Sequence, residues 1–289
     1  MGIPKSIVFA GCARDSAQFL PHVLKNIQRI SSLFSQSAVV VCENDSMDAT
    51  KQILSEWGRG RENFELLNLD GLGQRPSRTS RLEFARNILI EFIRTWGKVR
   101  GFELLFLLDF DNANVDELDL GALSEALEWI NGQQDVAAIF PNQVGGPYYD
   151  LWALRHETRC PGDVWEEVLD YSLKHKCDDE TAFQATFAKR FFSLPRDAAP
   201  LEVDSAFGGF GVYRLAYALK NKNPYLGQKI KVVWDAGKYS IILWQQCEHV
   251  HFHAGIRNLG GRLFVMPNLV NGNTKDFSVS SSGLRMRVF

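Results

Sequence analysis

Two aspartates, Asp109 and Asp111, follow directly on a run of apolar residues, 104–108. An apolar run without polar alternation is typical of a central strand that is covered on both faces, as in a parallel sheet. In an extended chain the two carboxylates point to the same side, so their oxygens can converge. Hard oxygen ligands with room for water suit Mg²⁺ or Mn²⁺ bound to a diphosphate. We therefore expect a divalent metal here; the alternative is that both residues only begin a turn.

A second acidic strand end follows the apolar residues 38–42 and carries Glu43 and Asp45. A carboxylate at this place can accept hydrogen bonds from a nucleobase or a ribose. Asp45 or Ser46 is expected to cap the helix behind it. An ordinary strand-to-helix turn would use the same residue types, because Asn, Asp and Ser favour turns.

Several arginines lie close to the start of a helix that a capping box of Ser80 and Glu83 predicts. Guanidinium groups beside a helix N-terminus can bind phosphate oxygens. The candidates for phosphate contact are Arg78, Arg81 and Arg86. Charged clusters are often only a solvated surface, and for Arg75 that interpretation is favoured.

Three histidines, His249, His251 and His253, recur with a spacing of two in residues 247–253. In an extended segment they would share one face. One imidazole could then complete an oxygen-rich metal shell, and three could bind zinc by themselves. Because the aspartate pair already indicates a metal, we predict that one histidine is a ligand, with His253 preferred to His249.

A glycine-rich stretch, residues 207–211, follows the acidic residue Asp204. Gly208 and Gly209 permit close approach of a ligand, and Phe207 could pack on a sugar ring. Asp204 could bind an acceptor hydroxyl or take its proton. A bulged strand is the alternative explanation for the glycines.

The aromatic stretch after residue 147 offers Tyr149 and Trp152 as stacking surfaces for a sugar. The same residues suit core packing equally well. Asp150, in this stretch, and Glu248, before the histidines, are the next candidates after Asp204 for a catalytic carboxylate.

These candidates sit on alternating strand-like and helix-like segments. Apolar runs predict strands at residues 7–10, 38–42, 64–69, 104–108 and 136–140, and periodic apolar positions predict helices between them. Such alternation implies right-handed crossovers and a mostly parallel sheet, whose ligands lie at the carboxyl ends of the strands.

The predicted fold is thus α/β, with a mostly parallel central sheet flanked by helices in one continuous domain. We place the domain at residues 1–277, with a nucleotide-binding half at 1–140 and an acceptor-side half at 141–277. A C-terminal tail is expected at residues 278–289, where little periodicity is left.

Composition excludes several classes of protein. The 289 residues carry a net charge of −2 and are 45% hydrophobic, so no overall charge attracts the chain to nucleic acid. No apolar run is long enough for a signal peptide or a membrane span. Five scattered cysteines favour reduced thiols. We expect a cytoplasmic protein with no transmembrane segment, for which peripheral membrane contact stays open.

Together these segments resemble the metal-dependent glycosyltransferases of the GT-A type, over roughly residues 7–271. The resemblance implies that Asp109 and Asp111 hold Mn²⁺ or Mg²⁺ on the diphosphate of a nucleotide sugar, and that a late histidine completes the shell. The residues expected to contact the nucleotide sugar, the arginines included, are Ala10, Cys12, Arg14, Glu43, Asp45, Arg78, Arg81, Arg86, Asp109 and Phe110.

More narrowly, residues 43–46 and 149–155 are similar to the fungal capsule α-1,3-mannosyltransferases and their bacterial relatives. That similarity suggests GDP-mannose as the donor and retention of configuration, which needs no dedicated base. We expect no counterpart here of the N-terminal membrane anchor of the fungal enzymes.

The expected activity is transfer of a hexose, mannose in the narrower case, to a glycan, a lipid-linked glycan or another hydroxyl acceptor. A sugar-nucleotide pyrophosphorylase is one alternative, but it needs a glycine-rich basic loop after the first strand, and residues 11–15 contain one glycine. A catalytically silent nucleotide- or glycan-binding module is the other. It would have no need of the aspartate pair and the histidines.

Overall fold

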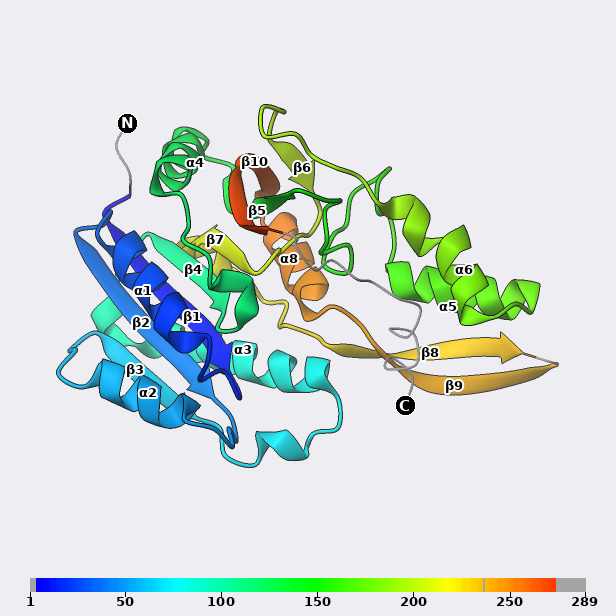
Figure 1. The fold of residues 1–289 in the computed structure, drawn as a ribbon, viewed down its shortest axis with the longest axis horizontal. Helices are drawn as coiled ribbons and strands as arrows, with labels where there is room; N and C mark the ends of the chain where they lie inside the picture. The colour runs from blue at the N-terminus through cyan, green and yellow to red at the C-terminus, as the bar shows by residue number, and fades with distance from the viewer. Residues whose placement is uncertain (1–3, 236, 274–289) are drawn as a thin grey trace.

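The structure is a computed structural model that describes residues 4–235 and 237–273 of the chain. The tail expected at residues 278–289 lies outside the described residues. Helices cover both faces of one central sheet, and a separate hairpin extends to the side (Figure 1).

In the described part of the chain, eight strands form the central sheet, in the order β3-β2-β1-β4-β7-β5-β10-β6. Parallel pairing joins β3, β2, β1 and β4, and also β5 and β10. β7 runs antiparallel between β4 and β5, and β6 runs antiparallel to β10. The strands are β1 (Ser6–Ala13), β2 (Gln36–Glu43), β3 (Phe64–Asn68), β4 (Leu104–Asp109), β5 (Val136–Val144), β6 (Leu201–Val203), β7 (Phe210–Arg214) and β10 (Arg262–Asn273).

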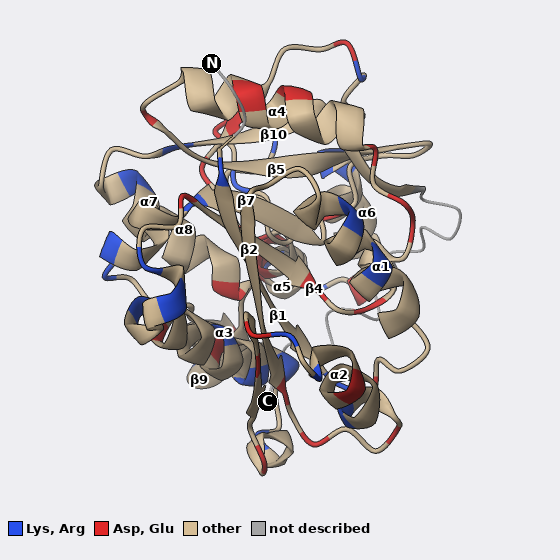
Figure 2. Cartoon of the chain, turned by 90° about the vertical axis from the view of Figure 1, so that its left-hand side faces the viewer, with Lys and Arg blue, Asp and Glu red and all other residues tan. Residues whose placement is uncertain are grey.

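The helices pack on the two faces, with α1 and α2 on one side of the strands and α3, α7 and α8 on the other (Figure 2). Their bounds are α1 (Leu20–Ser31), α2 (Thr50–Gly58), α3 (Arg78–Thr95), α4 (Leu120–Gly132), α5 (Val164–His175), α6 (Asp179–Ala185), α7 (Leu215–Lys220) and α8 (Glu248–Asn258). No helix among the described residues combines the length and the apolar character that crossing a membrane requires.

Strand β4 is buried on both faces, as its uninterrupted apolar run predicts. Leu104, Phe106 and Leu108 pack in the core under α1 and α4. Leu105 and Leu107 pack in the opposite core under α3 and α8. The mostly parallel α/β sheet is thereby confirmed, and the end of β4 is held rigidly from two sides.

The start of α3 differs from the prediction. Its N-cap is Ser77, whose hydroxyl accepts a hydrogen bond from the Ser80 amide at 3.1 Å. Glu83 does not complete a capping box, since its carboxylate accepts from the Gly227 amide at 2.7 Å instead. The helix therefore begins with Arg78 in its first turn, close to the carboxyl edge of the sheet.

The histidine segment is helical, so our prediction of an extended segment was wrong. In α8 the buried positions include His249, Phe252, His253 and Ile256, which is the spacing of a helix face that meets a core. His249 and His253 lie one turn apart, and His251 lies on another face of the helix.

The glycine segment forms the tight turn that leads into β7. Gly208 and Gly209 have φ values of +68° and +94°, which L side chains rarely adopt. A Cβ on Gly209 would lie 2.6 Å from the Asn271 side chain. The glycines therefore serve the turn and the close packing against β10.

The remaining strands, β8 (Gln228–Asp235) and β9 (Lys238–Gln245), form a two-stranded antiparallel hairpin of their own. The hairpin projects from the body of the protein beside α5 (Figure 1).

Candidate functional site

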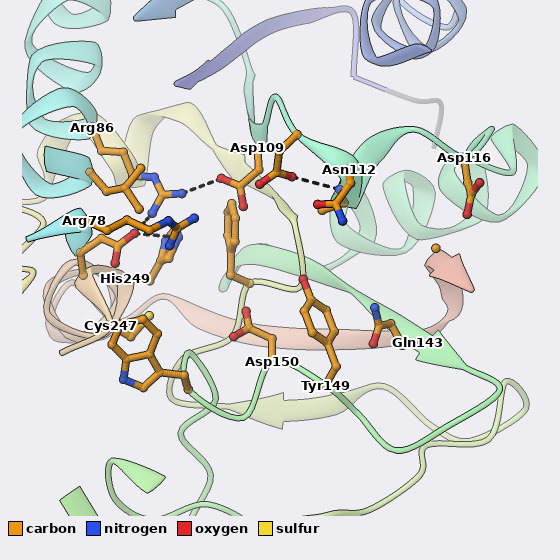
Figure 3. A pocket seen from close by; sticks show the side chains of 17 residues that line it. Arg78, Arg86, Asp109, Asn112, Asp116, Gln143, Tyr149, Asp150, Cys247 and His249 are labelled. Atoms are coloured by element: carbon orange, nitrogen blue, oxygen red, sulfur yellow. Dashed lines mark hydrogen bonds and ion pairs between the residues drawn. The ribbon is translucent and has the colours of Figure 1, made fainter. Parts of the chain in front are cut away.

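A cavity of about 510 Å³ opens at the carboxyl end of β4. Its walls come from the end of β4, the start of α3, the first turn of α8 and the loop after β5 (Figure 3). Arg78, Arg86, Asp109 and His249 gather at one end of this cavity in Figure 3. The carboxyl edge of the sheet, where the sequence places its ligand, is thus where the structure has its polar cavity.

Carboxylates outnumber cations in this cavity. The acidic residues that line it are Asp109, Asp111, Asp116, Asp150 and Glu248. The arginines that line it are Arg78 and Arg86. His249 adds no charge, because burial and the nearby Arg86 lower its pKa well below the usual range. An anionic ligand would therefore meet a surface of net negative charge unless it bound together with a cation.

Arg86 is buried and bridges two carboxylates. Its Nη2 lies 2.8 Å from Asp109 Oδ1, and its Nη1 pairs with Glu248. Although burial opposes its charge, the Asp109 carboxylate keeps the pKa of Arg86 above the usual value. Removing one member of such a buried network leaves an uncompensated charge, at a cost of about 3–5 kcal/mol. Arg86 thus fixes the position of Asp109 and is itself already neutralised.

Asp111 has a different environment from Asp109. One of its oxygens accepts from the Ala113 amide at 3.0 Å, which begins a short turn at residues 112–114. Burial, and then the charge on Asp109, raise the pKa of Asp111. Both effects oppose its charged form, and a bound cation would relieve both.

The structure contradicts the prediction that His253 is a metal ligand. Its Nδ1 lies 2.8 Å from the Ser205 hydroxyl and its Nε2 lies 2.9 Å from the Tyr213 hydroxyl, so both ring nitrogens are occupied. The side chain is fully buried, and burial with Arg86 lowers its pKa to about 3. His253 is a neutral core residue with no free nitrogen for a metal.

His249 is the histidine that faces the cavity. It is 2% exposed, and neither of its ring nitrogens has a hydrogen-bond partner among the described residues. The ring stacks on Phe207, with centroids 3.9 Å apart, which holds it in place. His251 is directed elsewhere, since its Nδ1 lies 2.7 Å from the Pro224 carbonyl oxygen.

Asp150 lies across the cavity from Asp109 (Figure 3). Its two oxygens accept from the Gly208 amide at 2.9 Å and from the Ala153 amide at 3.2 Å. Burial raises its pKa. Tyr149, Trp152 and Phe207 line the same cavity, so the aromatic residues predicted for a sugar do come together here.

A smaller cavity of about 220 Å³ adjoins the first and shares Arg78, Asp109 and Asp111 with it. The nucleotide candidates Cys12, Arg14, Arg78 and Arg81 line this second cavity. Burial raises the pKa of the Cys12 thiol to about 12, so the group stays neutral. The aspartate pair thus lines both cavities.

Two nucleotide candidates are buried in the core. Ala10 is fully buried within β1, and Phe110 is 1% exposed and packs beside Gly11 in the core under α1 and α4. Phe110 lies between Asp109 and Asp111 in an extended chain, so alternation sends its ring to the opposite side. Neither side chain lines a cavity described above.

Glu43 and Asp45 shape the backbone around the second strand end. Glu43 is 1% exposed and accepts from the Ser46 amide at 2.9 Å. Asp45 accepts from the amides of Gly71 and Gly73, and these hydrogen bonds lower its pKa. Neither residue caps α2, whose N-cap is Ala49 without a side-chain bond.

Asp204, our first candidate for a base, lies outside the cavity. Its carboxylate pairs with Arg257 near the end of α8 and is about half exposed. Gly208 and Gly209 also do not line the cavity, although the Gly208 amide orients Asp150. Arg155, which follows the aromatic stretch, pairs with Asp163 at 3.2 Å.

The sequence analysis did not propose several lining residues, among them Asn112, Asp116, Gln143 and Cys247. Gln143 could have been found, because it stands at the carboxyl end of β5, the edge where ligands of such sheets bind. Its side-chain oxygen is buried without a hydrogen-bond partner among the described residues. Asn112 and Asp116 lie in a loop, and no pattern in the sequence distinguishes them.

Comparison with family models and with the sequences of curated proteins gives no match. Among solved structures, the chain is similar to the mannosyltransferase PcManGT from Pyrobaculum calidifontis in complex with GDP-Man and Mn²⁺, with 13% identity and a TM-score of 0.50 over 93% of this chain and 56% of that one. It is also similar to residues 1–349 of S. aureus TarS, with 14% identity and a TM-score of 0.47 over 92% and 59% of the two chains.

A third similar structure is the glucosyl-3-phosphoglycerate synthase from Mycobacterium tuberculosis, with 11% identity and a TM-score of 0.37 over 74% of this chain and 57% of that one. The chain thus spans between 56% and 59% of the length of these solved chains. At such identities the similarity concerns the fold, which is α/β and GT-A-like, as the resemblance predicted.

Proposed function

We propose that this chain is a glycosyltransferase that depends on a divalent metal and moves a hexose from a nucleoside-diphosphate sugar to a hydroxyl acceptor. The observation that carries the proposal is the charge of the cavity at the end of β4. Five carboxylates face two guanidinium groups there, and one of these, Arg86, is already paired with two of the carboxylates. A diphosphate can enter such a cavity only together with a cation.

The residues present suit Mn²⁺ or Mg²⁺. Asp111 has a carboxylate whose charge is disfavoured in the cation's absence, Asp109 adjoins it, and His249 has unpartnered ring nitrogens. The described residues contain no group of three His, Cys, Asp or Glu side chains close enough to hold a metal alone. That agrees with an ion whose shell is completed by substrate phosphates and water. When bound, the metal offsets the charge that develops on the departing diphosphate.

The chain's own residues position the donor. Arg78, in the first turn of α3, faces both cavities and can donate to phosphate oxygens. Arg86 holds Asp109, and through Glu248 it ties the end of β4 to α8. We assign Glu248 this positioning role, because a carboxylate held by a buried guanidinium is poorly suited to accept a proton.

On the acceptor side we assign Asp150 ahead of Asp204. Asp150 is held by two backbone amides, lies in the cavity with Tyr149 and Trp152, and has a raised pKa. Such a carboxyl group can bind an acceptor hydroxyl and, if the reaction inverts the anomeric centre, take its proton. The aromatic side chains offer faces on which a sugar can stack.

The narrower proposal is mannose transfer from GDP-mannose to a glycan or lipid-linked glycan. It is supported by the similarity of residues 43–46 and 149–155 to the fungal capsule mannosyltransferases and their bacterial relatives. GDP-Man is also the donor bound in the PcManGT structure.

The test is to incubate the protein with a panel of nucleotide sugars and Mn²⁺, and to measure release of the nucleoside diphosphate and the shift in melting temperature. We expect one donor to be hydrolysed slowly and its nucleoside diphosphate to stabilise the protein only when metal is present. A silent binding module would show stabilisation without release. The proposal fails if no nucleoside diphosphate stabilises the protein with Mn²⁺.

A further inference from the structure

The β8–β9 hairpin exposes a continuous apolar face. Its antiparallel register sets three apolar pairs directly opposite one another, and all six side chains fall on the same face because they recur at every second position. The exposed fractions are 72% for Ile230, 60% for Val232, 56% for Trp234, 77% for Tyr239, 75% for Ile241 and 40% for Leu243.

The opposite face of the hairpin is already occupied. Lys229 lies 2.7 Å from Glu166 of α5, and Lys231 lies 2.8 Å from Glu166 and 2.9 Å from Asp170. These ion pairs attach the hairpin to α5, beside which it lies in Figure 1. A two-stranded hairpin is only marginally stable by itself, and burial of an apolar face is what ordinarily secures it.

We infer that a second copy of this chain covers the apolar face, so that two hairpins pack face to face around a two-fold axis. In such an interface each residue near the axis meets its own copy, and like charges there would repel one another. The six positions carry no charge. The face is therefore suited to meet itself, with Val232 and Ile241 at its centre.

The size of the face agrees with a dimer. A large aromatic side chain has roughly 150–250 Å² of surface. On that scale, the exposed parts of the six side chains amount to on the order of 700 Å². Two copies would then bury on the order of 1,400 Å², within the range of about 1,200–2,000 Å² for specific interfaces. The aromatic pair of Trp234 and Tyr239, with ring centroids 4.5 Å apart, supplies the large side chains that dominate such contacts.

A lipid surface fits the same face less well. The charged residues Asp235 and Lys238 end the two strands at the tip of the hairpin, so a tip-first insertion would bury both charges. The lysines that could attract anionic lipid, Lys229 and Lys231, are paired with carboxylates of α5.

Sedimentation equilibrium of the full chain, from about 1 to about 100 µM, covers the affinities expected of an interface of this size. We expect a reversible dimer, and Ile241→Lys should weaken it at least about 100-fold because it places two like charges at the axis. The matched control is Ser240→Lys, which adds the same charge to the opposite face of the same strand, at a position that is itself exposed, and should leave the dimer intact.

A second measurement does not depend on that variant folding well. Val232→Cys should give a cross-linked dimer with a short bismaleimide, and Ser240→Cys should give much less. A wild-type protein that is monomeric throughout overturns the proposal, and binding to phosphatidylglycerol vesicles would then identify a membrane as the occupant. A dimer that survives Ile241→Lys, without cross-linking at Val232→Cys, overturns it as well.

Discussion

The first two turns of α8 carry the same type of side chain in opposite situations. His249, in the first turn, faces the cavity with both ring nitrogens unpartnered among the described residues. His253, one turn further on, is sealed in the core with both nitrogens hydrogen-bonded. Buried polar atoms in proteins almost always have partners. His249 is thus the histidine that stays a candidate ligand, although both side chains are buried.

The largest expected effect concerns metal binding in the cavity that His249 faces. Asp111→Asn removes the carboxylate that shares the cavity with His249. We expect the affinity for Mn²⁺, in the presence of GDP or UDP, to fall by about 10²–10³-fold, or about 3–4 kcal/mol. Calorimetric titration measures it. The control is Asp119→Asn at the N-cap of α4, which should bind as the wild type does; equal binding by both variants would contradict the metal assignment.

The substitution His253→Phe tests whether the buried His253 has a purely structural role. This change leaves the buried hydroxyls of Ser205 and Tyr213 without their partner. We expect the free energy of unfolding to fall by about 3 kcal/mol, because each orphaned group costs about 1–3 kcal/mol. Urea denaturation measures the loss. Titration of the folded variant with Mn²⁺ should give the wild-type affinity, and a lost affinity would restore His253 as a ligand.

The same substitution in the first turn, His249→Phe, should have the opposite effects on stability and on Mn²⁺ binding. Phenylalanine keeps the stacking on Phe207 and removes two unsatisfied nitrogens, so we expect stability to rise by about 1 kcal/mol. The affinity for Mn²⁺ with nucleotide should fall by about 10–100-fold. A variant that is both destabilised and unchanged in metal binding would show that the two histidines do not differ as described.

The smallest effect is on the dependence of stability on pH. Both histidines have lowered pKa values, about 3 for His253, so the unfolded chain binds protons below pH 6.5 that the folded chain does not. Stability is then full above pH 6.5 and declines as the pH falls from there toward 3. Each histidine adds at most about 1.4 kcal/mol per pH unit. Urea denaturation from pH 7 to pH 5 should show a shallower decline for His249→Phe; an unchanged slope would mean that His249 is already protonated or exposed.

The fold could be predicted because its signals are local. The apolar run before Asp109 specifies a doubly covered strand, and periodic apolar positions specify the helices between the strands. The helix of the histidines was also encoded locally, in the spacing of His249, Phe252, His253 and Ile256. The spacing of the histidines alone predicts an extended segment, which is the wrong element.

The site could be predicted only in part, since its decisive contacts join distant residues. Arg86 and Glu248 are 162 positions apart, and nothing near either residue indicates the other. The bond of His253 to Ser205 spans 48 positions and disqualifies it as a ligand. Phe110 is different, because simple alternation along an extended chain already places it on the side away from Asp109 and Asp111.

The place of β7 in the sheet has a consequence for how the protein is made. β7 comes from residues 210–214, yet it lies between β4 and β5, which are synthesised long before it. Until then both strands present open edges, which are prone to pair with other chains. The amide of Asp109 also bonds the carbonyl of Gly209, at 3.0 Å, in the turn before β7. The sheet around the aspartate pair is therefore incomplete until residues 209–214 have been synthesised.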